Sequence, residues 1–230
     1  MARAVAPDPA VASRANVVLA TVSGIAAAVF NCAFLVQGLS PSSLSAVNGL
    51  LSELEARDQP ASRLFGWASL LSGLMAVVFA VALQRRLPLG RTGLTGCWAI
   101  ALFGLGGIAD ALMPMDCAPS VEAACRRLEE QGRLSWWHQG HTWSSVSGTV
   151  ALLASLWLLG RHLRGRPGWE VAAGVGRWGF PWLTAVSGAV AVMTLRYLPG
   201  LGVAQRVQTV GIAAWLVVLA LVQTRQPVNR

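Results

Sequence analysis

Charged residues are scarce in this chain, and lysine is absent. Only 12% of the 230 residues are charged, against roughly 25% in an ordinary soluble domain, and 54% are hydrophobic. The basic residues are all arginines, which stand singly or in short groups at the ends of apolar runs. A nucleic-acid-binding surface gathers its basic residues in one patch, so the formal charge of +8 does not indicate such a partner. The composition predicts an integral membrane protein.

Six apolar runs have the length of about 20 residues that a helix needs to cross a hydrocarbon core of about 30 Å. Glycine, alanine and serine are abundant inside them, which favours close packing of helices in lipid. We expect an all-α integral membrane fold with six transmembrane helices in one bundle, over residues 16–223, and no second domain. The predicted helices are 16–39, 63–84, 93–114, 138–160, 178–197 and 202–223.

The chain lacks an A-x-A-like cleavage site followed by a soluble domain, and its first apolar run is longer than a signal-peptide core. The first helix is therefore expected to stay in the mature protein. Residues 1–15 are predicted to be a cytoplasmic segment and residues 224–230 a cytoplasmic tail, in the plasma membrane of a bacterium. This orientation follows the positive-inside rule, because it leaves most arginines inside: Arg3, Arg14, Arg85, Arg86, Arg91, Arg161, Arg164, Arg166, Arg177, Arg225 and Arg230.

Cysteine is also rare, with four in the chain. Cys117 and Cys125 fall in a loop that this orientation places outside, whereas Cys32 and Cys97 fall within predicted helices. Two cysteines eight residues apart in an oxidising compartment predict a disulfide. Two free thiols are the alternative, and a metal-binding pair is disfavoured because no further cysteine lies nearby.

Two outer loops carry most of the polar sequence. In the first, residues 40–63, leucine and valine recur at helical spacing, which predicts a short amphipathic helix on the membrane surface or over the bundle. Such a helix would serve as a lid over a cavity or, the favoured alternative, as a packed connector. In the second loop, residues 126–133 (RRLEEQGR) are expected to be a solvated segment.

Strongly polar residues within or beside the predicted helices gather toward the outer ends. Ionisable groups inside a membrane are costly, so a one-sided cluster predicts a functional cavity. The alternative is a salt-bridge network that only fixes helix packing, for example between Asp110 and Arg206. A stripe at helical spacing, His138, His141, Ser145, Gly148 and Leu152, should face protein. The cluster contains Asn31, Gln37, Asp110, Asp116, His138, His141, Arg196, Gln205, Arg206 and Gln208.

Three kinds of chemistry fit these residue types. His138 and His141, three residues apart, could bind zinc together with Asp116 or Asp110 and activate a water molecule. Without metal, His141 could act as a base toward Ser145 or water. In the third, an aspartate protonates an isoprenoid double bond and tryptophans stabilise the carbocation. Trp136, Trp137 and Trp178 are more simply explained as membrane-interface residues. The other tryptophans that could line such a cavity are Trp98, Trp143, Trp182 and Trp215.

We expect a membrane-embedded enzyme that acts on a lipid or isoprenoid-type substrate by acid–base or metal-assisted hydrolysis, or by proton-initiated cyclisation. The rival is a non-enzymatic lipid-binding, transport or accessory protein; transport is disfavoured because internal repeats and interrupted helices are not evident. The catalytic candidates are Asp110, Asp116, His138 and His141. The candidates for binding a membrane lipid or other hydrophobic molecule are Asn31, Gln37, Trp137, Trp143, Ser145, Gln205 and Arg206.

Three segments of the chain resemble the bacterial and archaeal membrane proteins grouped as domain-of-unknown-function family 998. They are SELEARDQPASRLFGWASLLSGL, LMPMDCAPSVEAACRRLEEQGRLSWWHQGHTWSS and LPGLGVAQRVQTVGIAAWL. The second is the most specific, because it combines Pro-x-Asp-Cys, a second cysteine and His-x-x-His. The resemblance implies a six-helix membrane protein and does not imply a particular activity.

Overall fold

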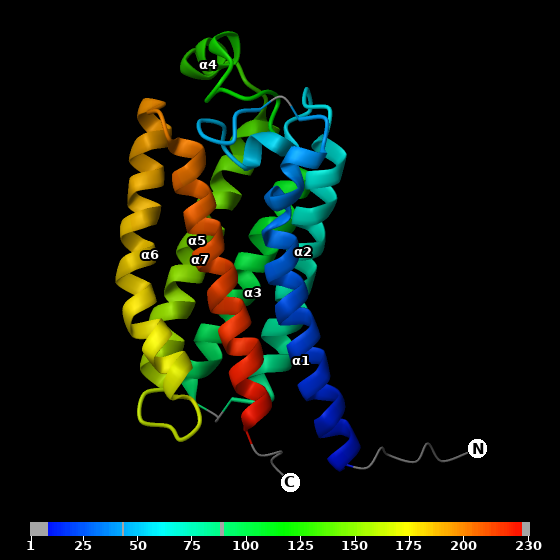
Figure 1. Ribbon diagram of the computed structural model, residues 1–230, viewed down its shortest axis with the longest axis vertical. Coiled ribbons are helices and arrows are strands. Elements are labelled where there is room, and N and C mark those ends of the chain that lie inside the picture. The colour runs from blue at the N-terminus through cyan, green and yellow to red at the C-terminus, as the bar shows by residue number, and fades with distance from the viewer. Residues whose placement is uncertain (1–8, 43, 88–89, 227–230) are drawn as a thin grey trace, which may run out of the picture.

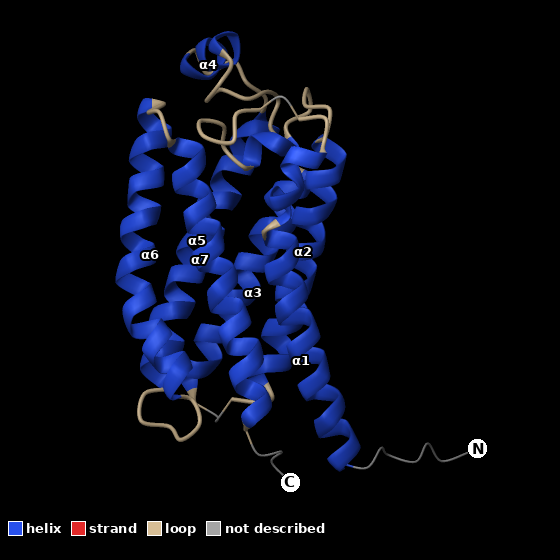
Figure 2. Ribbon diagram, in the orientation of Figure 1, coloured by secondary structure: helices blue, strands red, loops and turns tan. Residues whose placement is uncertain are grey.

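The computed structural model describes residues 9–42, 44–87 and 90–226. This part of the chain contains six helices long and apolar enough to cross a membrane and has no strand, so the predicted all-α fold is confirmed. The helices run alternately up and down in one bundle (Figures 1 and 2). Their bounds are α1 (Pro9–Asn31), α2 (Ser62–Gln84), α3 (Arg91–Leu112), α5 (Trp136–His162), α6 (Glu170–Arg196) and α7 (Leu201–Val222).

The six helices form a closed ring in chain order. Each packs against the next along the chain, and α1 closes the ring by packing against α7. Glycines allow the closest approaches: a Cβ atom on Gly73 of α2 would lie 2.5 Å from the carbonyl oxygen of Gly104 in α3. This is the packing that small residues permit in lipid, where helices gain contact by approaching closely.

The two halves of the bundle differ in character. α1 begins and α7 ends at the same end, and a single 3-10 turn, η3 (Gln223–Arg225), follows α7 there (Figure 1). We call the opposite end, which carries the loops 32–61, 113–135 and 197–200, the distal end. The apolar core, with Phe79, Leu159 and Trp215 at its centre, fills the half away from the distal end. Polar side chains therefore concentrate in the distal half.

The observed helices differ from the predicted spans at several ends. The α-helical part of the first span ends at Asn31 and continues as a 3-10 helix, η1 (Ala33–Leu39). Of the predicted cytoplasmic segments, residues 1–8 and 227–230 lie outside the described residues, and α1 already begins at Pro9. α6 begins eight residues earlier than expected, at Glu170, with Pro181 in its interior. Membrane helices tolerate such a proline because neighbouring groups satisfy the freed backbone.

The loops at the distal end also differ from expectation. In the first loop, the described residues 40–42 and 44–61 contain one 3-10 turn, η2 (Ser52–Glu55), and no amphipathic helix of greater length. Leu54 of this turn is buried against Phe65 and Ala118, so the loop is a packed connector. The expected solvated segment in the second loop is largely helical, as α4 (Ala123–Glu130), which stands above the bundle (Figure 1).

Candidate functional site

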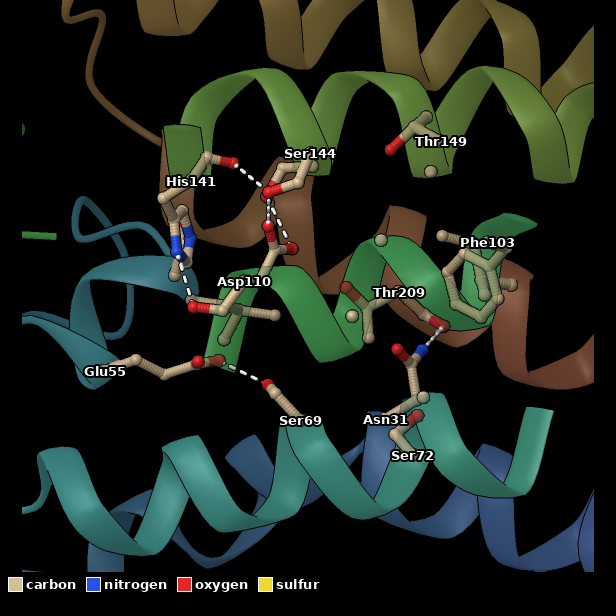
Figure 3. A pocket seen from close by; sticks show the side chains of 18 of the residues that line it. Asn31, Glu55, Ser69, Ser72, Phe103, Asp110, His141, Ser144, Thr149 and Thr209 are labelled. Atoms are coloured by element: carbon tan, nitrogen blue, oxygen red, sulfur yellow. Dashed lines mark hydrogen bonds between the residues drawn. The ribbon is translucent and has the colours of Figure 1, made fainter. Parts of the chain in front are cut away.

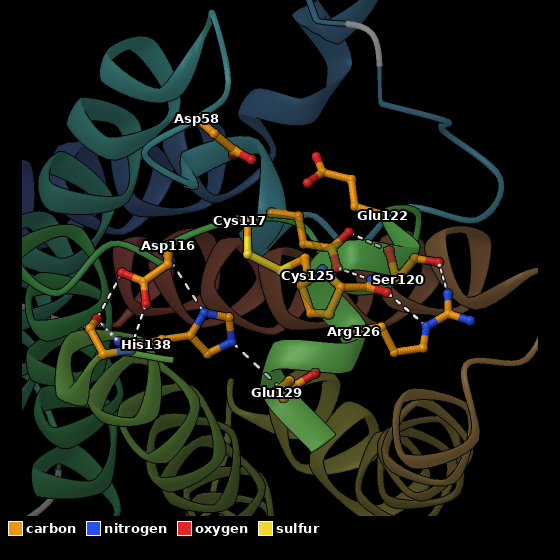
Figure 4. The surroundings of a disulfide bond; sticks show 12 residues. Asp58, Asp116, Cys117, Ser120, Glu122, Cys125, Arg126, Glu129 and His138 are labelled. Atoms are coloured by element: carbon orange, nitrogen blue, oxygen red, sulfur yellow. Dashed lines mark hydrogen bonds and ion pairs between the residues drawn. A yellow bond between two sulfur atoms is a disulfide. The ribbon is translucent and has the colours of Figure 1, made fainter. Parts of the chain in front are cut away.

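A disulfide stabilises the second distal loop. Cys117 and Cys125 are joined with an S–S distance of 2.04 Å, which confirms the predicted pair (Figure 4). The bond connects the start of α4 to the segment that leaves α3. Arg126 supports the same turn, because its guanidinium donates to the carbonyl oxygens of Pro119 at 3.0 Å and Ser120 at 2.8 Å.

The two long distal loops are joined to each other. Glu53 in the first loop is fully buried and accepts hydrogen bonds from the backbone of Leu50 at 3.0 Å and of Ser120 at 2.7 Å, and from the Ser120 hydroxyl. Burial raises the pKa of its carboxyl, although the bonds from Ser120 and Leu50 oppose the rise. The backbone N–H of Arg57 donates to the carbonyl oxygen of Met115 at 2.9 Å. Together the loops make one cap over the bundle.

Asp116 and His138 belong to this cap. Asp116 accepts from the backbone N–H and the hydroxyl of Ser135, at 2.6 and 2.7 Å, at the first turn of α5. Its own backbone N–H donates to Nδ1 of His138 at 3.2 Å, and His138 Nε2 lies 3.6 Å from a carboxylate oxygen of Glu129 (Figure 4). Partial burial acts to raise the pKa of Asp116, but the bonds from Ser135 and the charges of His138 and Arg57 lower it overall. Both residues hold the loop in place.

A cavity of about 160 Å³ lies beneath the cap, in the distal half of the bundle (Figure 3). Residues of α1, α2, α3, α5, α7 and η2 line it, so that five of the six membrane-spanning helices contribute to its wall. The lining is rich in serine, threonine, glutamine and acidic side chains, and it includes Asp110 and His141. A cavity of this size and polarity has room for several water molecules.

Asp110 lies in the last turns of α3 and faces α5. Its carboxylate accepts hydrogen bonds from the hydroxyls of Ser144 and Ser145, the latter at 2.8 Å (Figure 3). Its backbone carbonyl oxygen lies 3.1 Å from Nδ1 of His141. Asp110 therefore binds α5 through both its side chain and its main chain, and it orients the histidine.

The imidazole of His141 is held in one orientation. Nδ1 lies 3.1 Å from two carbonyl oxygens, those of Asp110 and Met113. Because a carbonyl oxygen can only accept a hydrogen bond, Nδ1 carries a proton, and Nε2 of the neutral ring has a free lone pair. The side chain is only 2% exposed, and Nε2 has no hydrogen-bond partner among the described residues. Buried polar atoms are rarely left unpaired, so this nitrogen is available to a molecule in the cavity.

Glu55 is the residue that sequence reasoning missed. It ends η2, reaches the cavity from the cap, and accepts a hydrogen bond from the Ser69 hydroxyl through Oε1 (Figure 3). Its other oxygen, Oε2, is buried without a hydrogen-bond partner among the described residues. Burial raises the pKa of Glu55 to about 8; the bond from Ser69 opposes the rise and the nearby Asp110 charge adds to it. The carboxyl group is therefore largely protonated at neutral pH.

The predicted substrate-binding residues divide into two groups. Asn31, Ser145 and Gln205 line the cavity. The side-chain oxygen of Gln205 also accepts a hydrogen bond from the backbone N–H of Leu51 at 2.5 Å, which connects α7 to the cap. The remaining four lie elsewhere and do not line it: Gln37, Trp137, Trp143 and Arg206.

Those four residues have other contacts. Arg206 donates to the side chain of Gln37 and to the carbonyl oxygens of Gly49 and Gly202, at 3.2 and 3.0 Å, and no ion pair with Asp110 is formed. Trp137 stacks on Trp136 with ring centroids 3.7 Å apart. Trp143 is 70% exposed on the surface of the bundle. Arg206 and Gln37 thus stabilise the loop, and the tryptophans lie outside the cavity.

The predicted zinc ligands are not brought together. His141 faces the cavity, whereas His138 and Asp116 are engaged in the cap, and no group of three or more histidine, cysteine or acidic side chains within 9–42, 44–87 and 90–226 could hold a metal ion. The expected aromatic cavity is not assembled either. Phe103 is the one aromatic side chain in the described lining, and buried Trp215 donates to Ser155 at 3.0 Å.

Comparison with known families gives one match. Residues 24–222 match the family model described as "Protein of unknown function (DUF998)". The chain belongs to this family. The match covers the cap, the cavity and the five long helices α2, α3, α5, α6 and α7 of this DUF998 protein, together with the last part of α1, and it confirms the resemblance noted from the sequence. No curated protein and no solved structure matches the chain.

Proposed function

We propose that this DUF998 protein is a membrane-embedded hydrolase that cleaves an ester bond in a lipid, with His141 as general base and Glu55 as general acid. One observation carries the proposal: two buried polar atoms without partners, Nε2 of His141 and Oε2 of Glu55, belong to side chains that line the same polar cavity. One has a free lone pair and the other belongs to a carboxyl group that is protonated at neutral pH. A base and an acid in these states are what hydrolysis requires.

Each group has one role in the reaction. Water in the cavity attacks the electrophilic atom of the ester while its proton moves to Nε2 of His141. Glu55 gives its proton to the leaving oxygen, so that the products are an acid and an alcohol and one water is consumed. The proton taken up by His141 then returns to Glu55 through water in the cavity, which restores both groups. Asp110 fixes the orientation of the ring through its backbone carbonyl oxygen. Ser145 already donates to Asp110, so we assign the nucleophile to water.

A lipid substrate fits the position and the size of the cavity. The cavity lies among helices of membrane-spanning length, and its volume of about 160 Å³ accommodates a headgroup linkage but not acyl chains. The chains would remain outside among the surrounding lipids. Cyclisation of an isoprenoid is less well supported, because Phe103 supplies the one aromatic face in the described lining.

The test is turnover by the purified protein in detergent, supplied with a membrane lipid extract and followed by mass spectrometry of the products. His141→Gln and Glu55→Gln should each lower turnover about 100-fold or more, because each removes one proton-transfer group. His138→Gln is the matched control, since this histidine lies one turn away and does not line the cavity. Melting temperatures measured for all three variants check that each is folded.

The rival function is a non-enzymatic lipid-binding or accessory role in which the polar cluster is structural. It is supported by the bonds of Asp110 to Ser144 and Ser145, which join α3 to α5. Under this alternative, no lipid in the extract is hydrolysed, and His141→Gln lowers the melting temperature. If the wild type hydrolyses a lipid and both His141→Gln and Glu55→Gln hydrolyse it equally well, our proposal is refuted.

We also infer that the distal end faces the outside of a bacterial plasma membrane. The arginine distribution supports this orientation, and so does the disulfide, which persists in oxidising compartments. Labelling reduced Cys117 in intact cells with a membrane-impermeant maleimide tests it. Labelling only after the cells are opened would show the reverse orientation.

A further inference from the structure

A second depression lies beside the cavity, on the outer surface of the bundle. This groove of about 320 Å³ runs between the distal ends of α2 and α3. Its apolar part includes Trp67 and Leu112, which are each 63% exposed on the surface of the bundle. Its polar part includes Arg57, from the cap, and Arg63, the second residue of α2. The groove therefore combines an apolar wall with two guanidinium groups at one end of the membrane-spanning region.

The charge of the groove favours an anion. Arg63 makes no hydrogen bond or ion pair with any residue that the structure describes, and it is exposed. The Arg57 guanidinium lies 3.7 Å from Asp116 and 5.8 Å from the ring centroid of Trp137, so it is held near the groove. Glu55 is the one acidic residue in the described lining, and its pKa of about 8 leaves it largely uncharged at neutral pH.

The groove and the cavity have Glu55 in common. This side chain lines both, with Oε1 bound to Ser69 and Oε2 unpaired. A molecule in the groove consequently lies beside the carboxyl group that we assign as the general acid. The groove lies on the outer surface of the bundle, whereas the cavity lies within the ring of helices, so Glu55 stands between the two.

We propose that this groove binds a phospholipid, with Arg63 and Arg57 paired to its phosphate and its acyl chains along Trp67 and Leu112. Guanidinium groups pair with phosphate oxygens through two parallel N–H donors, and tryptophan is favoured at the membrane interface. If the groove binds the substrate, the substrates of the hydrolase are phosphate-bearing lipids. That assignment rests on the proposed function; the binding of the lipid does not.

Native mass spectrometry of the full chain in detergent tests the binding directly. The probes are dioctanoylphosphatidylglycerol, dioctanoylglycerol, which lacks the phosphate, and inorganic phosphate, which lacks the chains. The first should bind at least about tenfold more tightly than either of the others, because only it uses both parts of the groove. Equal binding of dioctanoylglycerol, or displacement of the phospholipid by an equal concentration of phosphate, would overturn the proposal.

Substitutions in the groove test whether the phospholipid binds there. Arg63→Gln should weaken phospholipid binding about tenfold, the effect of one charge-assisted contact, and its fold should persist because Arg63 has no partner among the described residues. Trp67→Leu should weaken it as well, through the apolar wall. Arg91→Gln is the control, since this arginine begins α3 at the opposite end and should leave binding unchanged. Unchanged affinity in Arg63→Gln would exclude the groove as the site.

The same variants separate this inference from the proposed function. His141→Gln should lose turnover but bind dioctanoylphosphatidylglycerol normally, because the imidazole lines the cavity and not the groove. If His141→Gln keeps turnover while Arg63→Gln loses the lipid, the hydrolase mechanism is refuted and the groove stands. If His141→Gln loses turnover while Arg63→Gln binds normally, the mechanism stands and the groove is refuted.

Discussion

Replacing Glu55 by glutamine should remove a large part of the pH dependence of stability. The pKa of this buried carboxyl is about 8 in the folded protein, against an ordinary value of 4.5. Between these values the folded protein holds a proton that the unfolded chain has lost, so the free energy of unfolding falls as pH rises. The stabilisation is fully present below pH 4.5 and is lost by about pH 8. At about 1.4 kcal/mol per pH unit, the loss is at most about 5 kcal/mol.

The assay is unfolding by dodecyl sulfate in mixed micelles, followed by the fluorescence of the ten tryptophans, from about pH 5 to about pH 8.5. Glu55→Gln keeps the size of the side chain and an oxygen that can accept the bond from Ser69. Wild type and variant should therefore have similar stability near pH 5, and the variant should be the more stable by several kcal/mol near pH 8. Glu130→Gln, an exposed substitution on α4, is the control and should follow the wild type.

Parallel curves for wild type and Glu55→Gln would refute the reasoning. They would mean that Glu55 has the same pKa in the folded and unfolded protein. In that case the carboxyl group would be ionised at neutral pH and could not serve as the general acid. Other buried acids, such as Glu53, contribute equally to both proteins, so the difference between the two curves isolates Glu55.

Two further substitutions test the packing and the cap. Gly73→Ala should lower the free energy of unfolding by about 1–3 kcal/mol, because its Cβ would lie 2.5 Å from a backbone oxygen of α3. Gly66→Ala is the control: its Cβ would meet no atom within 4 Å, so the free energy of unfolding should stay the same. Cys117→Ser removes the disulfide and should lower the stability of the cap by about 2–3 kcal/mol, which is the loop-closure estimate for a separation of eight residues. The measurement is the rate of proteolysis of the second loop, which should increase. Cys32→Ser, at a free cysteine, should leave proteolysis unchanged.

The stripe predicted on α5 shows what helical periodicity can and cannot predict. His138, His141, Gly148 and Leu152 are all buried against protein, as their spacing predicts. The same spacing suggested that the two histidines share a site, but in the structure they have different partners. Residues three apart differ by about 60° in direction and about 4.5 Å in height, so His138 meets the cap and His141 the cavity.

Glu55 could not be recognised from the sequence. It stands in a polar loop between Leu54 and Ala56, where an exposed acid is the usual expectation. Its burial follows from the packing of Leu54 against Phe65 and Ala118, which presses η2 onto the bundle. Ala118 comes from the second distal loop, which lies far away in the sequence.

The sequence by itself determined the six helices, the polar distal half and the disulfide, because helix length, the cost of buried charge and cysteine spacing are local properties of the chain. Only the tertiary structure decided which polar residues share a cavity. The closed ring brings Asn31 of α1 next to Thr209 of α7, and the two loops jointly bury Glu55 above Asp110 and His141. Such groupings depend on helix rotation and on contacts between distant segments, which residue spacing does not encode.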